Sequence, residues 1–194
     1  ESDNTPFHVG SLVAYTQGAV KALAERGVEL AEGDVLIHNH PYYGASHSLD
    51  IAVIVPIFWR GELVAFSANT AHHLDIGGAQ PGGTIDLFDM YAEGRIFNAN
   101  FLYREGRRDD NMWAFCAGNV RAPREVIGDL ECQVAAAKHG ERRLLGLIRS
   151  PHGLIPQVSH RRPDRLGAGG RDPVRHQGGR RPARMGVAPD QSGR

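Results

Sequence analysis

The sequence predicts an α+β fold for residues 1–150, with mixed helices and a sheet that contains a β-hairpin. Two segments, at 11–26 and 123–138, carry apolar residues at helical spacing. Between them, two apolar runs at 51–58 and 63–68 are separated by a short polar turn, which is typical of a hairpin. Residues 151–194 show neither pattern, so we expect one domain followed by a tail.

The first half of the domain is predicted to contain one helix and three strands. The helix at 11–26 is followed by Gly27, which suits a C-terminal cap. A short apolar run at 34–38 indicates a strand, and Asn-His-Pro ends it. In the run at 51–58, Pro56 lacks a backbone N–H, so we expect that strand to lie at a sheet edge or to contain a bulge.

The second half is predicted to be a loop followed by helices. The segment 75–84 is rich in glycine and proline, and loops of this kind often carry chemistry. Short helices are expected at 86–93 and 109–117, with Asp109 and Asp110 as helix-starting charges. Pro123 suits the first turn of a longer helix, which ends near residue 138 or continues past Gly140 to 148.

The tail at 151–194 differs in composition from the rest. The chain has no net charge, but residues 1–150 hold 13 basic and 19 acidic side chains, whereas the tail holds nine arginines, no lysine and three aspartates. With eight glycines and six prolines, the tail cannot bury enough apolar area to offset its ordering entropy, so we expect disorder. Either it contacts nucleic acid or an acidic partner, or it has no function; we favour the second interpretation and predict no nucleic-acid partner. Its composition also resembles a GC-rich gene translated in a shifted frame.

Several classes of protein are excluded by absent signals. No apolar stretch approaches the roughly 20 residues that span a bilayer, and the N-terminus carries no signal-peptide pattern. Cys116 and Cys132 are too far apart for a redox pair, which favours free thiols in a reducing cytoplasm. We therefore expect a cytoplasmic chain without a membrane partner. No phosphate-binding loop is present, so we expect no nucleotide site in this chain.

Polar clusters flank the predicted hairpin. His47 and Asp50 precede it, and the pair His72–His73 follows it. Because a hairpin brings its two ends together, one of these two histidines can face His47 and Asp50. Two imidazoles and one carboxylate suit Mn, Fe or Zn and leave coordination positions open. Asp75 is a further ligand, a carboxylate that orients a ligand, or a turn former. Histidines at strand ends also commonly serve only packing, which is the alternative.

Four blocks along residues 8–148 resemble the hydantoinase B family. They are GDVLIHNHPYYGASHSLDI, VPIFWRGELVAFSANTAHHLDIGGAQPG, MYAEGRIF and NVRAPREVIGDLECQVAA. This family includes the B subunits of ATP-dependent hydantoinases, half of 5-oxoprolinase, and the alpha subunits of acetone and acetophenone carboxylases. The resemblance implies that His47, Asp50 and His72 correspond to the manganese ligands of the carboxylase branch, with His73 as a further or supporting residue. It implies that the chain is part of a larger family domain.

The resemblance also implies a function, with alternatives. The chain would be the metal-binding B-type subunit of a hydrolase that acts on cyclic amides, in a hetero-oligomer in which ATP is held by a hydantoinase-A-like subunit. The alternatives are the alpha subunit of a ketone carboxylase, or an inactive fragment, because family members are several hundred residues longer. No catalytic residue is identified.

One departure from the family pattern lies beside the predicted site. Asn39-His40-Pro41 stands where the family has Asn-Asp-Pro. His40 is therefore a candidate additional or supporting residue at the metal, and Asn39 and Tyr42 are assigned to a substrate pocket.

Overall fold

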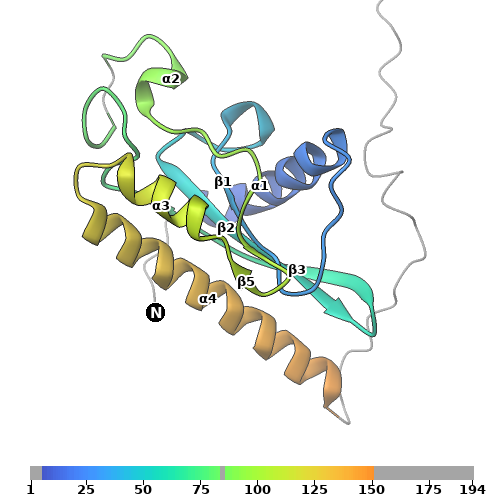
Figure 1. Cartoon of the computed structure of the whole chain (residues 1–194). Helices are drawn as coiled ribbons and strands as arrows, with labels where there is room; N and C mark the ends of the chain where they lie inside the picture. The colour runs from blue at the N-terminus through green and yellow to red at the C-terminus, as the bar shows by residue number, and fades with distance from the viewer. Residues whose placement is uncertain (1–5, 84–85, 151–194) are drawn as a thin grey trace, which may run out of the picture. The chain divides into compact units, whose positions relative to one another are not determined.

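The computed structural model describes residues 6–83 and 86–150, which form an antiparallel sheet with helices on both faces (Figure 1). The strand order is β3-β2-β1-β4-β5. The strands are β1 (Val35–His38), β2 (Asp50–Trp59), β3 (Glu62–His72), β4 (Asn100–Arg104) and β5 (Arg107–Arg108). The helices are α1 (Pro6–Glu25), the 3₁₀ helix η1 (Pro41–Tyr43), α2 (Met90–Glu93), α3 (Asp110–Gly118) and α4 (Pro123–Arg149). The predicted α+β class is confirmed, whereas the predicted tail at 151–194 lies outside the described residues.

Strand β2 runs through the middle of the core and is buried on both faces. Ile51, Val53 and Val55 pack in the cluster that contains α3 and α4, whereas Ala52 and Ile54 pack in the cluster that contains α1. Successive side chains of a strand point to opposite faces, so a strand covered on both sides is apolar throughout. This explains why residues 51–58 form a continuous apolar run rather than an alternating one.

The edge predicted at Pro56 exists only locally. Strand β2 lies between β1 and β3, but its pairing with β1 ends at the pair Leu36–Ile54. Pro56 therefore has a neighbouring strand on one side alone, where it pairs with Phe66. A register irregularity follows between Ile57 and Phe58, which agrees with the predicted bulge.

The helices extend and refine the predicted ones. Helix α4 continues through Gly140 to Arg149, so the longer of the two predicted ends is confirmed. Asp109 caps α3, accepting the N–H groups of Asn111 and Met112 at 3.1 Å each. The helix expected at 86–93 is confined to α2, which is capped by Asp89. The predictions missed β4 and β5 because these strands are short and partly polar.

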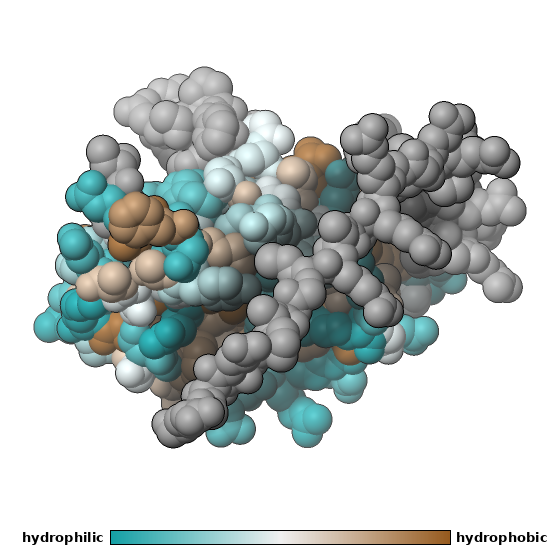
Figure 2. Space-filling model, turned by 90° about the horizontal axis from the view of Figure 1, so that it is seen from above, coloured by the Kyte–Doolittle hydropathy of each residue, from teal (hydrophilic) through white to brown (hydrophobic). Residues whose placement is uncertain are grey.

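Figure 2 shows hydrophobic side chains scattered among hydrophilic ones on the face that it displays. None of the helices within residues 6–83 and 86–150 has the length and apolar character that a membrane span requires.

Candidate metal centre

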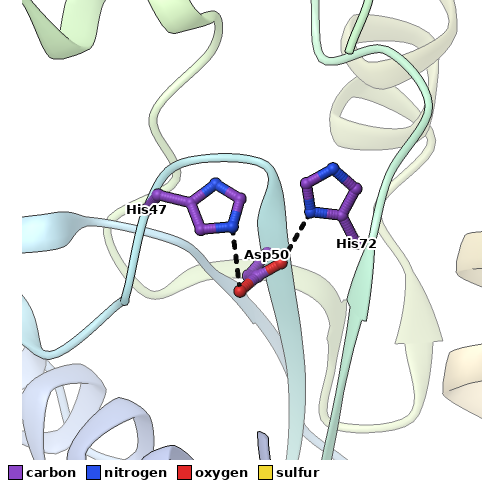
Figure 3. Close-up of side chains that lie close together, drawn as sticks. All are labelled: His47, Asp50 and His72. Atoms are coloured by element: carbon purple, nitrogen blue, oxygen red, sulfur yellow. Dashed lines mark hydrogen bonds and ion pairs between the residues drawn. The ribbon is translucent and has the colours of Figure 1, made fainter. Parts of the chain in front are cut away.

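The hairpin of β2 and β3 places two of the predicted ligands side by side. Asp50, the first residue of β2, is the register partner of His72, the last residue of β3. His47 lies three residues earlier in the turn that leads into β2, where its carbonyl accepts the N–H of Asp50 at 3.3 Å. His47, Asp50 and His72 therefore meet at one end of the hairpin (Figure 3). We call these three residues the His–Asp–His cluster.

Both imidazoles of the cluster point at the carboxylate between them. His47 Nε2 lies 3.1 Å from Asp50 Oδ2, and His72 Nδ1 lies 2.9 Å from Asp50 Oδ1. The two ring centroids are 5.0 Å apart, and one donor atom from each residue lies within 4.8 Å of the other two. Nitrogen and oxygen ligands about 2.1 Å from one ion lie ~3.0–3.4 Å from each other. The two nitrogen–oxygen distances are thus close to the spacing that a metal ion requires, and the full set of donor atoms lies within 4.8 Å.

Burial within the cluster is uneven. The Asp50 side chain is 1% exposed, whereas those of His47 and His72 are 37% and 49% exposed. The hydrogen bond with Asp50 raises the pKa of His47, although partial burial of the ring opposes this. A buried carboxylate is costly unless a cation balances it. A protonated histidine or a divalent cation can supply that charge here, so the donor set fits a metal ion that is reached from solvent.

His73 is held away from the cluster. It is fully buried, and its Nε2 lies 2.8 Å from Gln133 Oε1 on α4. The Gln133 amide nitrogen in turn donates to Ile51 O at 2.9 Å and to Asn69 Oδ1 at 3.0 Å, so the orientation of the amide is fixed. Burial lowers the pKa of His73. Of the two histidines that the sequence left open, the structure brings His72 to Asp50 and places His73 against α4.

Asp75 also lies outside the cluster. Its Oδ2 accepts the backbone N–H of Arg121 at 2.6 Å, and its Oδ1 contacts the Arg121 guanidinium and the Gly77 N–H at 2.9 Å each. Burial would raise the pKa of Asp75, but these hydrogen bonds outweigh it, and the pKa lies below its ordinary value. Asp75 therefore ties the loop after β3 to the segment before α4, and it also forms the turn that the sequence offered as one of its roles.

The remaining predicted residues lie on the segment that leads to His47. Asn39 is fully buried; its amide donates to Ser48 O and Arg95 O, and its oxygen accepts the Phe97 N–H at 2.6 Å. His40 caps η1, with Nδ1 accepting the Tyr42 N–H at 3.3 Å. Tyr42 is 82% exposed. The structure does not bring these three residues into the cluster.

Two residues beside the cluster escaped the sequence predictions. Tyr15, buried on α1, accepts the Ser46 N–H at 3.0 Å through its hydroxyl, and Glu93 accepts the Ser48 N–H at 3.0 Å. They hold the backbone on either side of His47. Spacing along the chain could not reveal contacts across 31 and 45 residues. For Glu93, the only signal was its place in the MYAEGRIF block.

A comparison with known families identifies the class of protein to which this fold belongs. The family model for hydantoinase B/oxoprolinase matches residues 1–153. The chain belongs to this family.

Known relatives are much longer than this chain. A Pseudomonas sp. (strain NS671) protein, provisionally named as the B-type component of a D-/L-hydantoinase, is 42% identical over 155 residues, which are 79% of this chain and 26% of that protein. The crystal structure of an ATP-dependent caprolactamase from Pseudomonas jessenii has a TM-score of 0.61 and 35% identity over 71% of this chain and 25% of that one. A nucleotide-free acetone carboxylase structure has the same TM-score at 23% identity, over 71% of this chain and 19% of that one, and shares the fold. The chain thus spans about a quarter of the length of the first two.

Proposed function

We propose that this chain is the metal-binding part of a B-type subunit of an ATP-dependent hydrolase that acts on cyclic amides. In this proposal the His–Asp–His cluster holds one divalent cation, either Mn, Fe or Zn. The observation that carries it is the Asp50 carboxylate, which is buried between two imidazole nitrogens at 2.9 and 3.1 Å. Without a cation, such a carboxylate would depend on a protonated imidazole for its compensating charge.

The cluster is suited to a cation that also meets a substrate. A bound divalent cation would polarise a carbonyl oxygen, such as that of a cyclic amide. Asp50 supplies negative charge from the buried side, while the half-exposed rings of His47 and His72 border solvent. Three protein ligands leave coordination positions for water or substrate on that open side.

We propose further that ATP binds to a separate A-type subunit. The sequence contains no phosphate-binding loop, yet the lactamase relative is described as ATP-dependent. The alternative of a ketone carboxylase has the same fold likeness, since both solved structures score 0.61. The sequence identity is 35% with the caprolactamase and 23% with the acetone carboxylase, which supports the cyclic-amide branch.

Metal titration of the purified chain tests the site. After treatment with a chelator and dialysis, we expect the chain to bind Mn²⁺ or Zn²⁺ at about one ion per chain, measured by calorimetry and elemental analysis. Asp50→Asn and His72→Ala should each weaken metal binding by more than about 100-fold. Each removes a direct ligand, and loss of a residue that only hydrogen-bonds to a ligand already lowers metal affinity about 10–100-fold.

The matched control removes a histidine elsewhere. His139→Ala deletes an exposed imidazole on α4, outside the cluster, and should leave metal affinity unchanged. A chain that unfolds cooperatively but binds no ion, or cluster variants that bind as well as the control, would contradict the proposal.

A further inference from the structure

A single hydrogen bond joins the turn of the cluster to a segment far along the chain. Glu93, the last residue of α2, accepts the backbone N–H of Ser48 through Oε2 at 3.0 Å. Ser48 stands between His47 and Asp50, the two ligands that the turn presents. The Glu93 carboxylate therefore contacts the backbone of the metal-binding turn without belonging to the His–Asp–His cluster.

Ser48 depends on side chains for its backbone hydrogen bonds. It is fully buried, and it precedes β2, so it has no place in the ladder of the sheet. Its carbonyl accepts the Asn39 amide, and its N–H is bonded by Glu93. A buried backbone N–H that loses its partner costs free energy, and the chain then moves to find another. Removing the Glu93 carboxylate would thus release the turn.

The backbone at Glu93 is itself clamped. Ala79 N–H donates to Ala92 O, and Arg95 N–H donates to Ile76 O, each at 2.8 Å. These two bonds join the segment 76–79 to the segment 92–95 on both sides of Glu93.

Glycine at position 94 is required for this clamp. Gly94 has φ +144°, and a Cβ there would lie 2.4 Å from Ile76 Cγ1, so a larger residue would be strained as well as crowded. Glu93 is therefore presented to Ser48 from a fixed backbone rather than from a freely moving loop.

We propose that Glu93 is a positioning residue for the metal site, which holds His47 and Asp50 in their binding arrangement by accepting the Ser48 N–H. This inference rests on the proposed function, because it concerns the affinity of the same cluster for a divalent cation. Groups that orient metal ligands typically account for 10–100-fold in metal affinity. The role of Glu93 requires a hydrogen-bond acceptor and not a charge.

The test compares Glu93→Gln with Glu93→Ala in the full chain. Glutamine keeps an oxygen that can accept the Ser48 N–H, whereas alanine keeps none. We expect Glu93→Gln to bind Zn²⁺ or Mn²⁺ within about fivefold of the unmodified chain, the scale of one charge that is still partly exposed to solvent. Glu93→Ala should bind about 10–100-fold more weakly. Glu29→Ala, which removes an exposed glutamate elsewhere, is the control and should have no effect.

A second measurement reports on the turn itself. Hydrogen exchange of the Ser48 amide should be faster in Glu93→Ala than in the unmodified chain and unchanged in Glu93→Gln. If Glu93→Ala fails to fold, Glu93→Asp replaces it, because aspartate keeps the charge but is one methylene too short to reach Ser48. It should then bind metal as weakly as expected for alanine.

The outcomes separate this inference from the proposed function. If Glu93→Ala binds metal with the affinity of the unmodified chain, the positioning role is overturned. It is also overturned if Glu93→Gln binds metal as weakly as Glu93→Ala, because the loss of affinity would then be due to the lost charge. If the unmodified chain binds no ion, the proposed function fails. The exchange rates then decide the role of Glu93, and equal rates for Ser48 in the unmodified chain and Glu93→Ala would overturn it.

Discussion

The histidines around the sheet divide by the partner that each ring meets. His47 and His72 face the Asp50 carboxylate and remain partly exposed. His38 and His73 are fully buried and face neutral groups. In His38, Nδ1 accepts the Ala99 N–H at 3.2 Å, so Nε2 carries the proton and donates to Tyr43 O at 3.0 Å. The neutral ring of His38 thus uses both nitrogens, and this role needs no metal.

The environment of His38 predicts how stability changes with pH. Burial lowers the pKa of His38 below its ordinary value of 6.5. As the pH falls through 6.5, His38 binds a proton in the unfolded chain but stays neutral in the folded chain, so the free energy of unfolding decreases. Each such histidine contributes at most about 1.4 kcal/mol per pH unit. We expect His38→Gln to show a shallower loss of stability between pH 7.5 and 5.5, measured by urea denaturation with a chelator present.

The comparison of slopes isolates His38 from the other histidines. The lowered pKa of His73 acts in the same direction, whereas the raised pKa of His47 stabilises the fold at low pH and opposes them. Both contributions are present in the unmodified chain and in His38→Gln, so they cancel when the two slopes are subtracted. Parallel slopes in the two proteins would show that His38 takes up its proton equally in the folded and unfolded chains.

At the scale of elements, the sequence predicted the hairpin, which depends on local patterns, but not the contacts between residues far apart in the chain. The hairpin followed from two apolar runs and a turn, and it brought His47 and Asp50 to His72 as expected. The choice between His72 and His73 could not be read from the sequence, because it depends on Gln133, 60 residues further along the chain. The same holds for Glu93 and Tyr15, whose contacts with the turn around His47 exist only once the chain has folded.

Helix α4 offers a matched pair of glycines at which packing opposes helix propensity. At Gly128 an added Cβ would meet nothing within 4 Å, whereas at Gly140 it would lie 2.3 Å from the hydroxyl of Ser67 on β3. Alanine is favoured over glycine in a helix interior by about 1 kcal/mol. We expect Gly128→Ala to raise the free energy of unfolding by about that amount and Gly140→Ala to raise it less or to lower it, measured by urea denaturation.

The two substitutions control for each other, since both exchange glycine for alanine in one helix. An equal gain from both would show that α4 does not need a glycine where it crosses β3. A loss at Gly128 would show that α4 gains nothing there from helix propensity.

At the scale of the molecule, one strand pair and the turn before it carry the cluster, and helices on both faces of the sheet hold the residues around it. The hairpin supplies Asp50 and His72, α1 reaches the turn through Tyr15, and α2 reaches it through Glu93. On the opposite face, α4 holds His73 through Gln133. The described residues therefore include both the proposed ligands and the side chains that support them, while the chain spans only about a quarter of the length of the hydantoinase and caprolactamase relatives. Those relatives contain further parts, which a test of activity can include.

A chimera can supply those parts and test the proposed reaction. Residues 1–153 of this chain would replace the matching segment of the caprolactamase, with the rest of that enzyme present. Because the fold matches at a TM-score of 0.61 and 35% identity, we expect the chimera to retain measurable ATP-dependent hydrolysis of the lactam. Asp50→Asn in the chimera should lower the rate of lactam hydrolysis at least about 100-fold, which exceeds the effect typical of residues that only hydrogen-bond to metal ligands. His139→Ala should leave the rate unchanged. A chimera that assembles and hydrolyses the lactam equally well with Asp50→Asn would separate the cluster from catalysis, because the one buried carboxylate between the two imidazoles would then be dispensable to the reaction.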